Sequence, residues 1–316
     1  MSVKCEKKFI GEDQVALDML KIMKDEGLES TFDRVDQQTP QCGFGSLGLC
    51  CRHCQMGPCN IDPFGRGAKA GICGADANTI AARHYLRMIA AGTAAHSDHG
   101  REVAHLFISV ARGEAPGYKI KDKEKLFMLA GLFEVSTKDR KIEEIAEEVG
   151  EMALAEFGKA HGFQTLVKRA PKARQKLWEK LGITPRAIDR EVVESMHRTG
   201  MGTDQDYENL IKQAHRVSLA DGWGGAMLAT ELQDIMFGTP IPTAGKADIS
   251  IFKKDTVNIA IHGHEPPVAE MVAVVSQDPK FIQMAKDKGA AGGITIGGLC
   301  CTANEMLVRH GIPLAG

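Results

Sequence analysis

The chain has 316 residues, of which 43% are hydrophobic and 25% are charged, and its formal net charge is −2. This balance is typical of a globular protein that is long enough for two domains. It leaves no basic stripe for nucleic acid and no polybasic segment for a membrane surface, so we expect small molecules and proteins as partners. No apolar run approaches the roughly 20 residues of a spanning helix, and the N-terminus lacks a signal-peptide core. The sequence therefore predicts a cytoplasmic protein that neither inserts into a membrane nor binds nucleic acid.

The first 240 residues have the patterns of an almost wholly helical domain, which we predict to span residues 1–240. Apolar positions recur at helical spacing in residues 14–25, and a long helix rich in Ala, Leu and Ile is expected from about 77 to 112. Gly92 and Gly100 in that helix are expected to be close-packing points or kinks. Further helices are predicted at 122–134, 139–158, 186–199, 203–219 and 223–237.

The pattern changes after the Gly-Thr-Pro-Ile-Pro turn at 238–242. Residues 256–263 are expected to form a buried strand and residues 293–298 a second one, with a helical stretch at 267–287 between them that is interrupted at Asp278–Pro279. This order predicts a parallel βαβ unit with a right-handed crossover. We therefore predict that residues 241–316 form a partial α/β Rossmann-like domain.

Only two strands are expected in this second domain, because the chain ends soon after the next helix starts. Two parallel strands do not make a stable open sheet. The domain is therefore expected either to borrow its missing strands or to be the first part of something longer.

Six of the nine cysteines fall within residues 42–73, which are otherwise rich in glycine and are expected to form a loop with short turns. In a reducing compartment such crowding indicates metal binding rather than disulfides. Four of them follow the pattern C-x2-C-x4-C-x13-C, namely Cys51, Cys54, Cys59 and Cys73. This pattern is typical of a [4Fe–4S] cluster. A structural zinc ion also takes four thiolates and is the alternative.

Cys42 and Cys50 remain as a C-x7-C pair. Neighbouring residues such as Cys50 and Cys51 rarely direct their sulfurs at the same small cluster, so we assign the two to different sites. Two thiolates are half of a site, and a twofold homodimer would supply the other half from its partner. The alternative is that Cys42 and Cys50 are two spare thiols.

A second group of metal-binding residue types follows the two predicted strands. His262 and His264 come at the carboxyl end of the first strand, where ligands of parallel sheets bind. Cys300 and Cys301 follow the second strand, just ahead of a capping box at Thr302–Glu305 that is expected to start a helix. The pattern indicates a mixed nitrogen and sulfur metal site, and the alternative is a polar strand end with two buried cysteines.

Two histidines of the long predicted helix, His96 and His99, are three residues apart and therefore share a face. His105 is nine residues from His96 and faces elsewhere. The Ala-rich, apparently buried stretch around them raises the chance that His96 and His99 handle protons. Ordinary helix-surface histidines are the alternative.

Six segments together resemble the N-terminal half of the anaerobic nickel–iron–sulfur carbon monoxide dehydrogenases, in that family's order: CGFGSLGLCCRHCQMGPCNIDPFG, GICGADANTI, AAGTAAHSDHGR, LADGWGGAML, HGHEP and GLCCTANEML. The resemblance extends over essentially the whole chain. It implies oxidation of CO with water to CO2, two protons and two electrons at a [Ni–4Fe–4S] cluster. It also implies [4Fe–4S] clusters that carry the electrons out, a homodimer, and a redox partner such as ferredoxin.

The resemblance implies a role for each motif residue. Cys42 and Cys50 would hold the cluster shared across the dimer axis, and Cys51, Cys54, Cys59 and Cys73 would hold the [4Fe–4S] relay beside it. His264 and Cys301 would bind the active-site iron outside the cubane, with Cys300 as an unliganded neighbour. His96 would handle protons near bound CO2, and His99 would begin a relay that often continues with a histidine where this chain has Glu102.

The family continues well beyond residue 316, into regions that supply the remaining cysteines around nickel and the catalytic lysine. We therefore expect this chain to be truncated and unable to oxidise CO by itself, because nickel and iron in such a site need several thiolates. The alternative hypothesis is a non-catalytic iron–sulfur module for electron transfer and dimerisation.

Overall fold

The computed structural model describes residues 14–241, 243–245, 247–248, 251–263 and 266–315. It divides into two compact units, one made of residues 48–242 and 264–268, the other of residues 1–47, 243–263 and 269–316. The first is called the helical unit below and the second the α/β unit. None of the helices in the described part of the chain combines the length and the apolar character needed to cross a bilayer.

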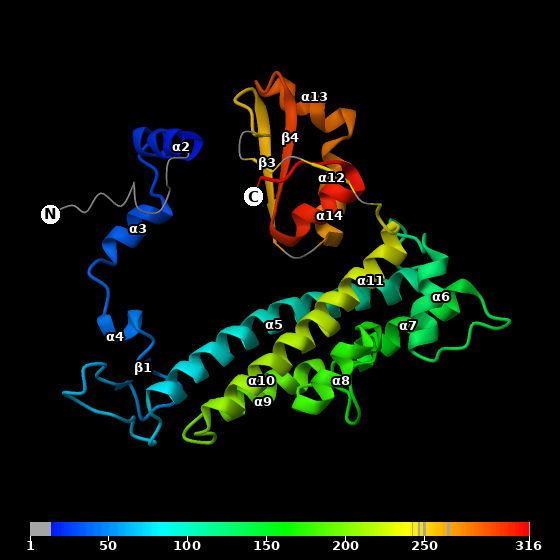
Figure 1. Cartoon of the computed structure of the whole chain (residues 1–316). Coiled ribbons are helices and arrows are strands. Elements are labelled where there is room, and N and C mark those ends of the chain that lie inside the picture. The colour runs from blue at the N-terminus through cyan, green and yellow to red at the C-terminus, as the bar shows by residue number, and fades with distance from the viewer. Residues whose placement is uncertain (1–13, 242, 246, 249–250, 264–265, 316) are drawn as a thin grey trace. The chain divides into compact units, whose positions relative to one another are not determined.

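The helical unit is organised around one long helix, α5 (Ala77–Ala111), drawn in cyan in Figure 1. The side chain of Asp76 caps its N-terminus by accepting a hydrogen bond from the Thr79 amide at 2.8 Å. Ala82, Leu86 and Ala90 form an apolar stripe on this helix because they are spaced four residues apart. The predicted helix at 77–112 is therefore confirmed.

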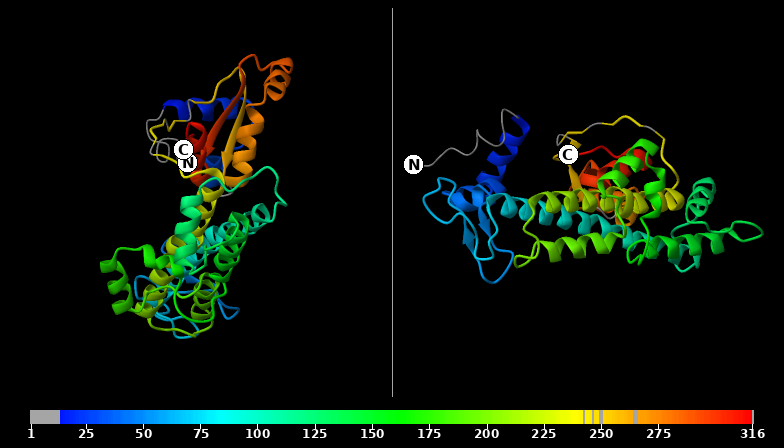
Figure 2. Two further views of the ribbon diagram at one scale, coloured as in Figure 1. Left: turned by 90° about the vertical axis from the view of Figure 1, so that its right-hand side faces the viewer. Right: turned by 60° about the horizontal axis from the view of Figure 1, so that its bottom comes forward.

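Two consecutive helices pack along α5, and the views in Figures 1 and 2 both show them running beside it. These are α10 (Tyr207–Ala220) and α11 (Ala226–Phe237), joined by a π-helical turn, η2 (Asp221–Gly225). On α10, Leu210, Ala214 and Val217 pack against the apolar stripe of α5.

The π-turn lies very close to α5. A Cβ atom on Gly100 would stand 2.5 Å from the Gly225 carbonyl oxygen, so only glycine fits there. The prediction of close packing is therefore confirmed for Gly100. It is wrong for Gly92, where a Cβ atom would meet nothing within 4 Å, because that position faces open space.

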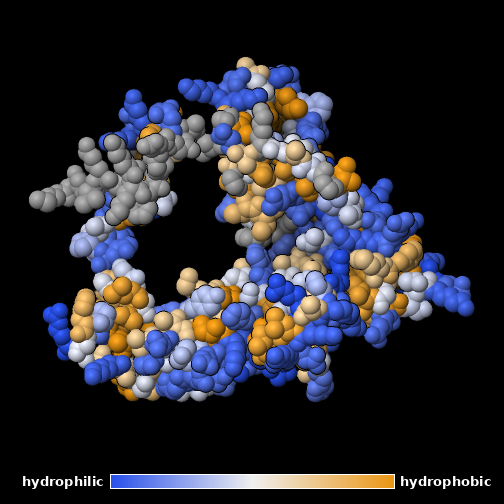
Figure 3. Space-filling view, in the orientation of Figure 1, coloured by the Kyte–Doolittle hydropathy of each residue, from blue (hydrophilic) through white to orange (hydrophobic). Residues whose placement is uncertain are grey.

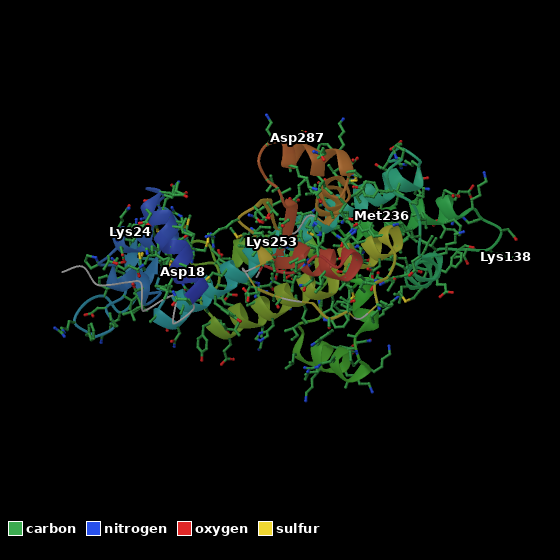
Figure 4. The ribbon with its side chains drawn as sticks, turned by 90° about the horizontal axis from the view of Figure 1, so that it is seen from above. Asp18, Lys24, Lys138, Met236, Lys253 and Asp287 are labelled. Atoms are coloured by element: carbon green, nitrogen blue, oxygen red, sulfur yellow. The ribbon has the colours of Figure 1, made fainter. Side chains whose placement is uncertain are left out.

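The described part of the helical unit has four further helices and one 3-10 turn. They are α6 (Lys123–Leu132), α7 (Ile142–Ala155), a 3-10 turn η1 (Thr165–Arg169), α8 (Lys172–Leu181) and α9 (Ile188–Arg198). The largest core cluster combines side chains of α5, α6, α7 and α11, including Phe107, Leu129, Val149 and Leu232. Figure 4 labels Met236, which is fully buried on α11, and Lys138 in the loop between α6 and α7. The helix α8 was not predicted.

The cysteine segment contains more regular structure than the predicted loop and turns. Cys50–Cys51 (β1) pairs antiparallel with Cys59–Asn60 (β2), and Gly43–Ser46 forms a short helix, α4, in the α/β unit. Backbone hydrogen bonds of this hairpin fix the spacing between Cys51 and Cys59, which stand opposite each other. Sequence periodicity did not reveal β1 and β2 because each strand has only two residues.

In the α/β unit, β3 (Thr256–His262) pairs in parallel with β4 (Gly293–Leu299) along seven residue pairs. The helices α12 (Pro266–Ser276) and α13 (Pro279–Asp287) connect them, so the predicted parallel βαβ order is confirmed. Side chains of α12 and of α14 (Cys300–His310) pack on the sheet through Ala269, Ala273 and Met306. Lys253, just before β3, and Asp287, at the end of α13, are labelled in Figure 4.

Three details of this unit differ from the predictions. The helix α14 begins at Cys300 with Leu299 as its uncapped N-cap, so the capping box at Thr302 is wrong: Thr302 already lies inside the helix. The chain completes α14 and then bridges back in parallel, from Leu314 to Gly298 and Ala247. The strand β3 is only partly buried, because β4 is its sole strand partner among the described residues.

The α/β unit also holds two N-terminal helices. The helix α2 (Gln14–Asp25) agrees with the predicted helix at 14–25. The helix α3 (Thr31–Gln37) was missed, although Ser30 and Asp33 form a capping box in which Ser30 Oγ accepts from the Asp33 amide at 3.2 Å. Because its seven residues bury no side chain, α3 carries no apolar pattern.

Candidate metal centre

The four cysteines of the C-x2-C-x4-C-x13-C pattern line one pocket of the helical unit. Cys51 and Cys59 come from the two strands of the hairpin, Cys54 from its loop, and Cys73 from the segment that leads into α5. His53 and Arg83 line the same pocket. No group of three or more His, Cys, Asp or Glu side chains in the described ranges is arranged to hold a single metal ion. The four predicted thiols nevertheless line the same pocket, so the structure gathers them around a shared space.

Glycines bring the backbone close to these cysteines. A Cβ atom on Gly57 would lie 2.8 Å from the Cys51 carbonyl oxygen, and one on Gly71 would lie 3.3 Å from Cys59 Cβ. Next to Gly71, the amide of Ile72 donates to Cys59 Sγ at 3.4 Å. Amide groups directed at cysteine sulfur are typical of iron–sulfur sites, where they stabilise negative charge on the sulfur.

Positive charge surrounds the pocket. The side chain of Arg83 is 1% exposed, and its Nη1 donates to Cys73 Sγ at 3.5 Å. Burial raises the pKa of the Cys73 thiol, but hydrogen bonds from Arg83 and the Ala75 backbone outweigh burial and lower that pKa overall. The lower pKa makes the thiolate, which is the form that binds metal, easier to form at Cys73.

His53 responds to the same charges. Burial first, and then the charges of Arg87 and Arg83 among its neighbours, lower the pKa of His53 to about 4. Buried Nε2 of His53 and buried Nε of Arg83 have no hydrogen-bond partner in the described part of the protein. Buried donors without partners are expected where a further group binds, so four thiols, a buried cation and these nitrogens together fit an anionic metal–sulfur cluster.

Cys42 and Cys50 do not line this pocket. Cys50 and Cys51 are adjacent in β1, so their side chains point to opposite faces of the hairpin. The Cys50 carbonyl oxygen lies 3.0 Å from His84 Nε2, and the His84 ring stands 4.6 Å from that of His53. Cys42 is exposed at the N-cap of α4 in the other unit. This geometry supports the separation of Cys50 from Cys51.

The edge of the parallel sheet brings one histidine and one cysteine together, as the sequence predicted. His262 ends β3 opposite Leu299, and its Nε2 lies 3.0 Å from Cys300 Sγ. Cys300 has a φ of 60°, a conformation that is uncommon for residues other than glycine. Cys301 is exposed on the first turn of α14. His264 lies outside the described residues, so the pairing of His264 with Cys301 stays a prediction.

The histidine pair of α5 lies beside the π-turn. Both carboxylate oxygens of Asp221 are 3.0 Å from His96 Nδ1, whose N–H donates to them. His99 Nε2 accepts from the Gln233 amide nitrogen at 3.2 Å, which leaves its proton on Nδ1. The two imidazoles are half-buried, whereas Glu102 and His105 are exposed. Fixed tautomers are what a proton-handling histidine needs.

Sequence reasoning missed Arg83 and Asp221. Arg83 stands three residues from both Ile80 and Leu86, so it interrupts the buried face of α5, and a charge in that position was a usable signal. Asp221 is followed by a Gly-Trp-Gly-Gly sequence, and nothing in that pattern showed that it faces His96. The contact depends on the π-turn, which periodicity does not reveal.

The fold and the site define a class of protein that is mostly helical, with four cysteines in one pocket and a small parallel sheet. The chain belongs to the Prismane/CO dehydrogenase family, which matches residues 49–316.

The chain is similar in sequence and structure to several carbon monoxide dehydrogenases. Carbon monoxide dehydrogenase 1 of Methanosarcina mazei is 52% identical over 304 residues, which cover 96% of this chain and 48% of that protein. A nickel-free carbon monoxide dehydrogenase from Thermococcus sp. AM4 superimposes with a TM-score of 0.92 at 46% identity, covering 100% of this chain and 50% of its own. An acetyl-CoA synthase/carbon monoxide dehydrogenase described with NiZn[Fe4S4] and NiNi[Fe4S4] clusters has a TM-score of 0.86 at 38% identity, covering 96% and 45%. The chain spans about half the length of the curated relatives it matches.

Proposed function

We propose that this chain carries the electron-relay part and some of the active-site ligands of an anaerobic, nickel-dependent carbon monoxide dehydrogenase. The reaction converts CO and water into CO2, two protons and two electrons. The observation that carries the proposal is the pocket in which Cys51, Cys54, Cys59 and Cys73 surround a common space beside the buried Arg83 cation. Similarity to carbon monoxide dehydrogenases over 96% of the chain supports the choice of reaction.

The cysteines have three proposed roles. Cys51, Cys54, Cys59 and Cys73 hold a [4Fe–4S] relay cluster, and Cys42 with Cys50 holds half of a cluster that a second copy of the chain completes. Cys301, together with His264, binds iron of the active-site [Ni–4Fe–4S] cluster, which needs several further thiolates. On this assignment the 316-residue chain alone does not oxidise CO, and its electrons would pass to a redox partner such as ferredoxin.

The histidines handle protons in this proposal. When it is bound, the nickel–iron–sulfur group supplies the centre at which CO is oxidised. Asp221 holds the Nδ1–H of His96, so Nε2 is the atom that takes up or releases a proton. His99, on the same face of α5, passes protons on toward the surface.

We also propose that the chain consists of a helical domain, residues 1–240, and a partial Rossmann-like domain, residues 241–316, and that it works in the cytoplasm. No disulfide joins the six cysteines of residues 42–73, which suits a reducing compartment.

The test is anaerobic purification of the 316-residue chain. Bound iron with inorganic sulfide, visible charge-transfer absorption and a paramagnetic signal after reduction are expected. Zinc in place of iron would contradict the proposal.

A second candidate function is a non-catalytic electron-transfer and dimerisation module. It is favoured by the four thiols gathered in the pocket, because an electron-transfer module needs that centre and no active site. Two measurements separate the dehydrogenase from the module: nickel content and CO-dependent reduction of a viologen dye. Both are made on protein expressed without and with the DNA downstream of codon 316. Activity that returns with the downstream sequence favours the dehydrogenase, and inactivity in both favours the module.

A further inference from the structure

Arg83 is the most deeply buried cation near the cysteine pocket. Its side chain is 1% exposed and reaches from α5 into the pocket. Nη1 donates to Cys73 Sγ at 3.5 Å, and Nη2 donates to the Asp204 carbonyl oxygen at 2.7 Å. Only one of its two terminal nitrogens is therefore committed to the protein backbone, and the other faces sulfur.

The guanidinium keeps its charge, because arginine is not deprotonated in proteins. Within the described residues, Arg83 makes no ion pair with a carboxylate; the carboxylate of Asp204 lies 3.3 Å from Arg198 instead. A buried cation without an anionic partner is strongly unfavourable. The pocket that Arg83 lines together with Cys73 is therefore suited to an anionic group that would balance this charge.

The loop between α9 and α10 holds this arrangement in place, and Figure 1 shows that connection beside the start of α5. Gln205 Nε2 donates to the Cys73 carbonyl oxygen at 2.6 Å, and Thr79 Oγ1 donates to the Gln205 carbonyl oxygen at 3.0 Å. A Cβ atom on Gly202 would stand 3.3 Å from Cys73 Cβ. Because Cys73 and the Asp204 carbonyl are fixed by the same loop, Arg83 has one geometry available.

We propose that Arg83 sets the reduction potential of the four-cysteine centre, making the centre easier to reduce. The inference rests on the proposed function, since it requires an iron–sulfur cluster in the pocket. Reduction adds one electron to the cluster and breaks no bond, so the negative charge beside Arg83 grows by one unit. A fixed cation at this distance stabilises the reduced state more than the oxidised state. Arg83 is a positioning residue that acts through the Cys73 sulfur.

The test compares three variants of the 316-residue chain, purified without oxygen. In each, iron is counted and the potential is measured by a dye-mediated titration followed by electron paramagnetic resonance. We expect R83Q to reduce the equilibrium constant for reduction about tenfold, which lowers the potential by about 59 mV. R83K keeps the charge and is expected to shift the potential less. R87Q removes a charge that also acts on His53, but Arg87 lies one turn further along α5 and donates to Thr199 Oγ1 at 2.8 Å rather than to a cysteine. We therefore expect R87Q to lower the potential less than R83Q does, and an equal shift in the two variants overturns the inference.

An unchanged potential in R83Q with a full complement of iron overturns the inference. If R83Q fails to hold a cluster, a second experiment tests the inference. The wild-type chain is labelled with ¹⁵N-arginine, and pulsed electron paramagnetic resonance of its reduced cluster measures the coupling to arginine nitrogen. A nitrogen coupling that persists in R87K and disappears in R83K supports the inference, and a wild-type cluster without that coupling overturns it. A wild-type chain free of iron overturns the proposed function itself, and the inference falls with it.

Discussion

The cysteine pocket of the helical unit and the sheet edge of the α/β unit both carry residues that bind metals, yet they are built differently. At the pocket, four thiols, a buried arginine and several donors converge from one hairpin, one helix and one loop. At the sheet edge, His262 and Cys300 touch each other, and both are exposed. The difference teaches that residue types at the right spacing predict where a site lies, while the structure shows which charges and hydrogen-bond donors surround those residues.

Figure 3 adds a contrast within the helical unit. Hydrophilic residues cover much of its visible face, and hydrophobic patches lie between them, one of them at the end that carries the cysteine segment. Phe64 and Ile72 of that segment are 74% and 68% exposed. Exposed apolar residues of this kind are typical of surfaces that contact other proteins. The proposed homodimer is one such contact.

The largest expected effect comes from removing one thiolate of the pocket. We expect Cys54→Ala to abolish the relay cluster, because three thiolates no longer satisfy all four iron atoms of a cubane. Iron content and the reduced-state paramagnetic signal measure the loss. A Cys54→Ala chain with the same iron as the wild type would show that the pocket does not hold the cluster.

Cys42→Ala tests the division of the cysteines into two sites. We expect it to remove the dimer-shared cluster and to leave the Cys51–Cys73 cluster in place, because Cys42 does not line the pocket. Iron per chain and the oligomeric state in anaerobic gel filtration are the measurements. Loss of all iron in this variant would show that Cys50 and Cys51 serve one centre.

A pair of glycines on α5 tests how the histidine site is held. Gly100→Ala places a Cβ atom 2.5 Å from the Gly225 carbonyl oxygen, and we expect a loss of about 1–3 kcal/mol in the free energy of unfolding. Gly92→Ala meets nothing within 4 Å and is expected to stabilise the helix by about 0.5–1 kcal/mol. Urea unfolding of both variants measures the difference. Equal effects at the two positions would refute the close contact between α5 and the π-turn.

The smallest effect is expected at the sheet edge. Cys300→Ala removes the contact with His262, but Cys300 is exposed, so the free energy of unfolding should change by less than about 0.5 kcal/mol. Relay-cluster iron should also stay at the wild-type level. Loss of that iron would mean that the cysteine pocket depends on the sheet edge, and the two could not be treated as separate sites.

Long periodic elements were predictable because burial repeats along them. The helix at 14–25 and the helix at 77–112 were located to within one residue, and the two parallel strands nearly so. Short elements failed for the opposite reason: α3, with seven residues, buries no side chain and leaves no pattern. The start of α14 at Cys300 was also missed, since a capping box suggested Thr302 while pairing of β4 with β3 ends at Leu299.

The sequence by itself determined which residues have the chemistry of a metal site, because thiolates at fixed short spacing have few other uses in a reducing compartment. Tertiary structure alone decided what surrounds them. Arg83 meets Cys73 because a loop 121 residues further along the chain, at Asp204, holds its guanidinium. His96 meets Asp221 because Gly100 and Gly225 let two helices approach closely. Contacts between residues so far apart depend on packing, and packing is not encoded in any local spacing.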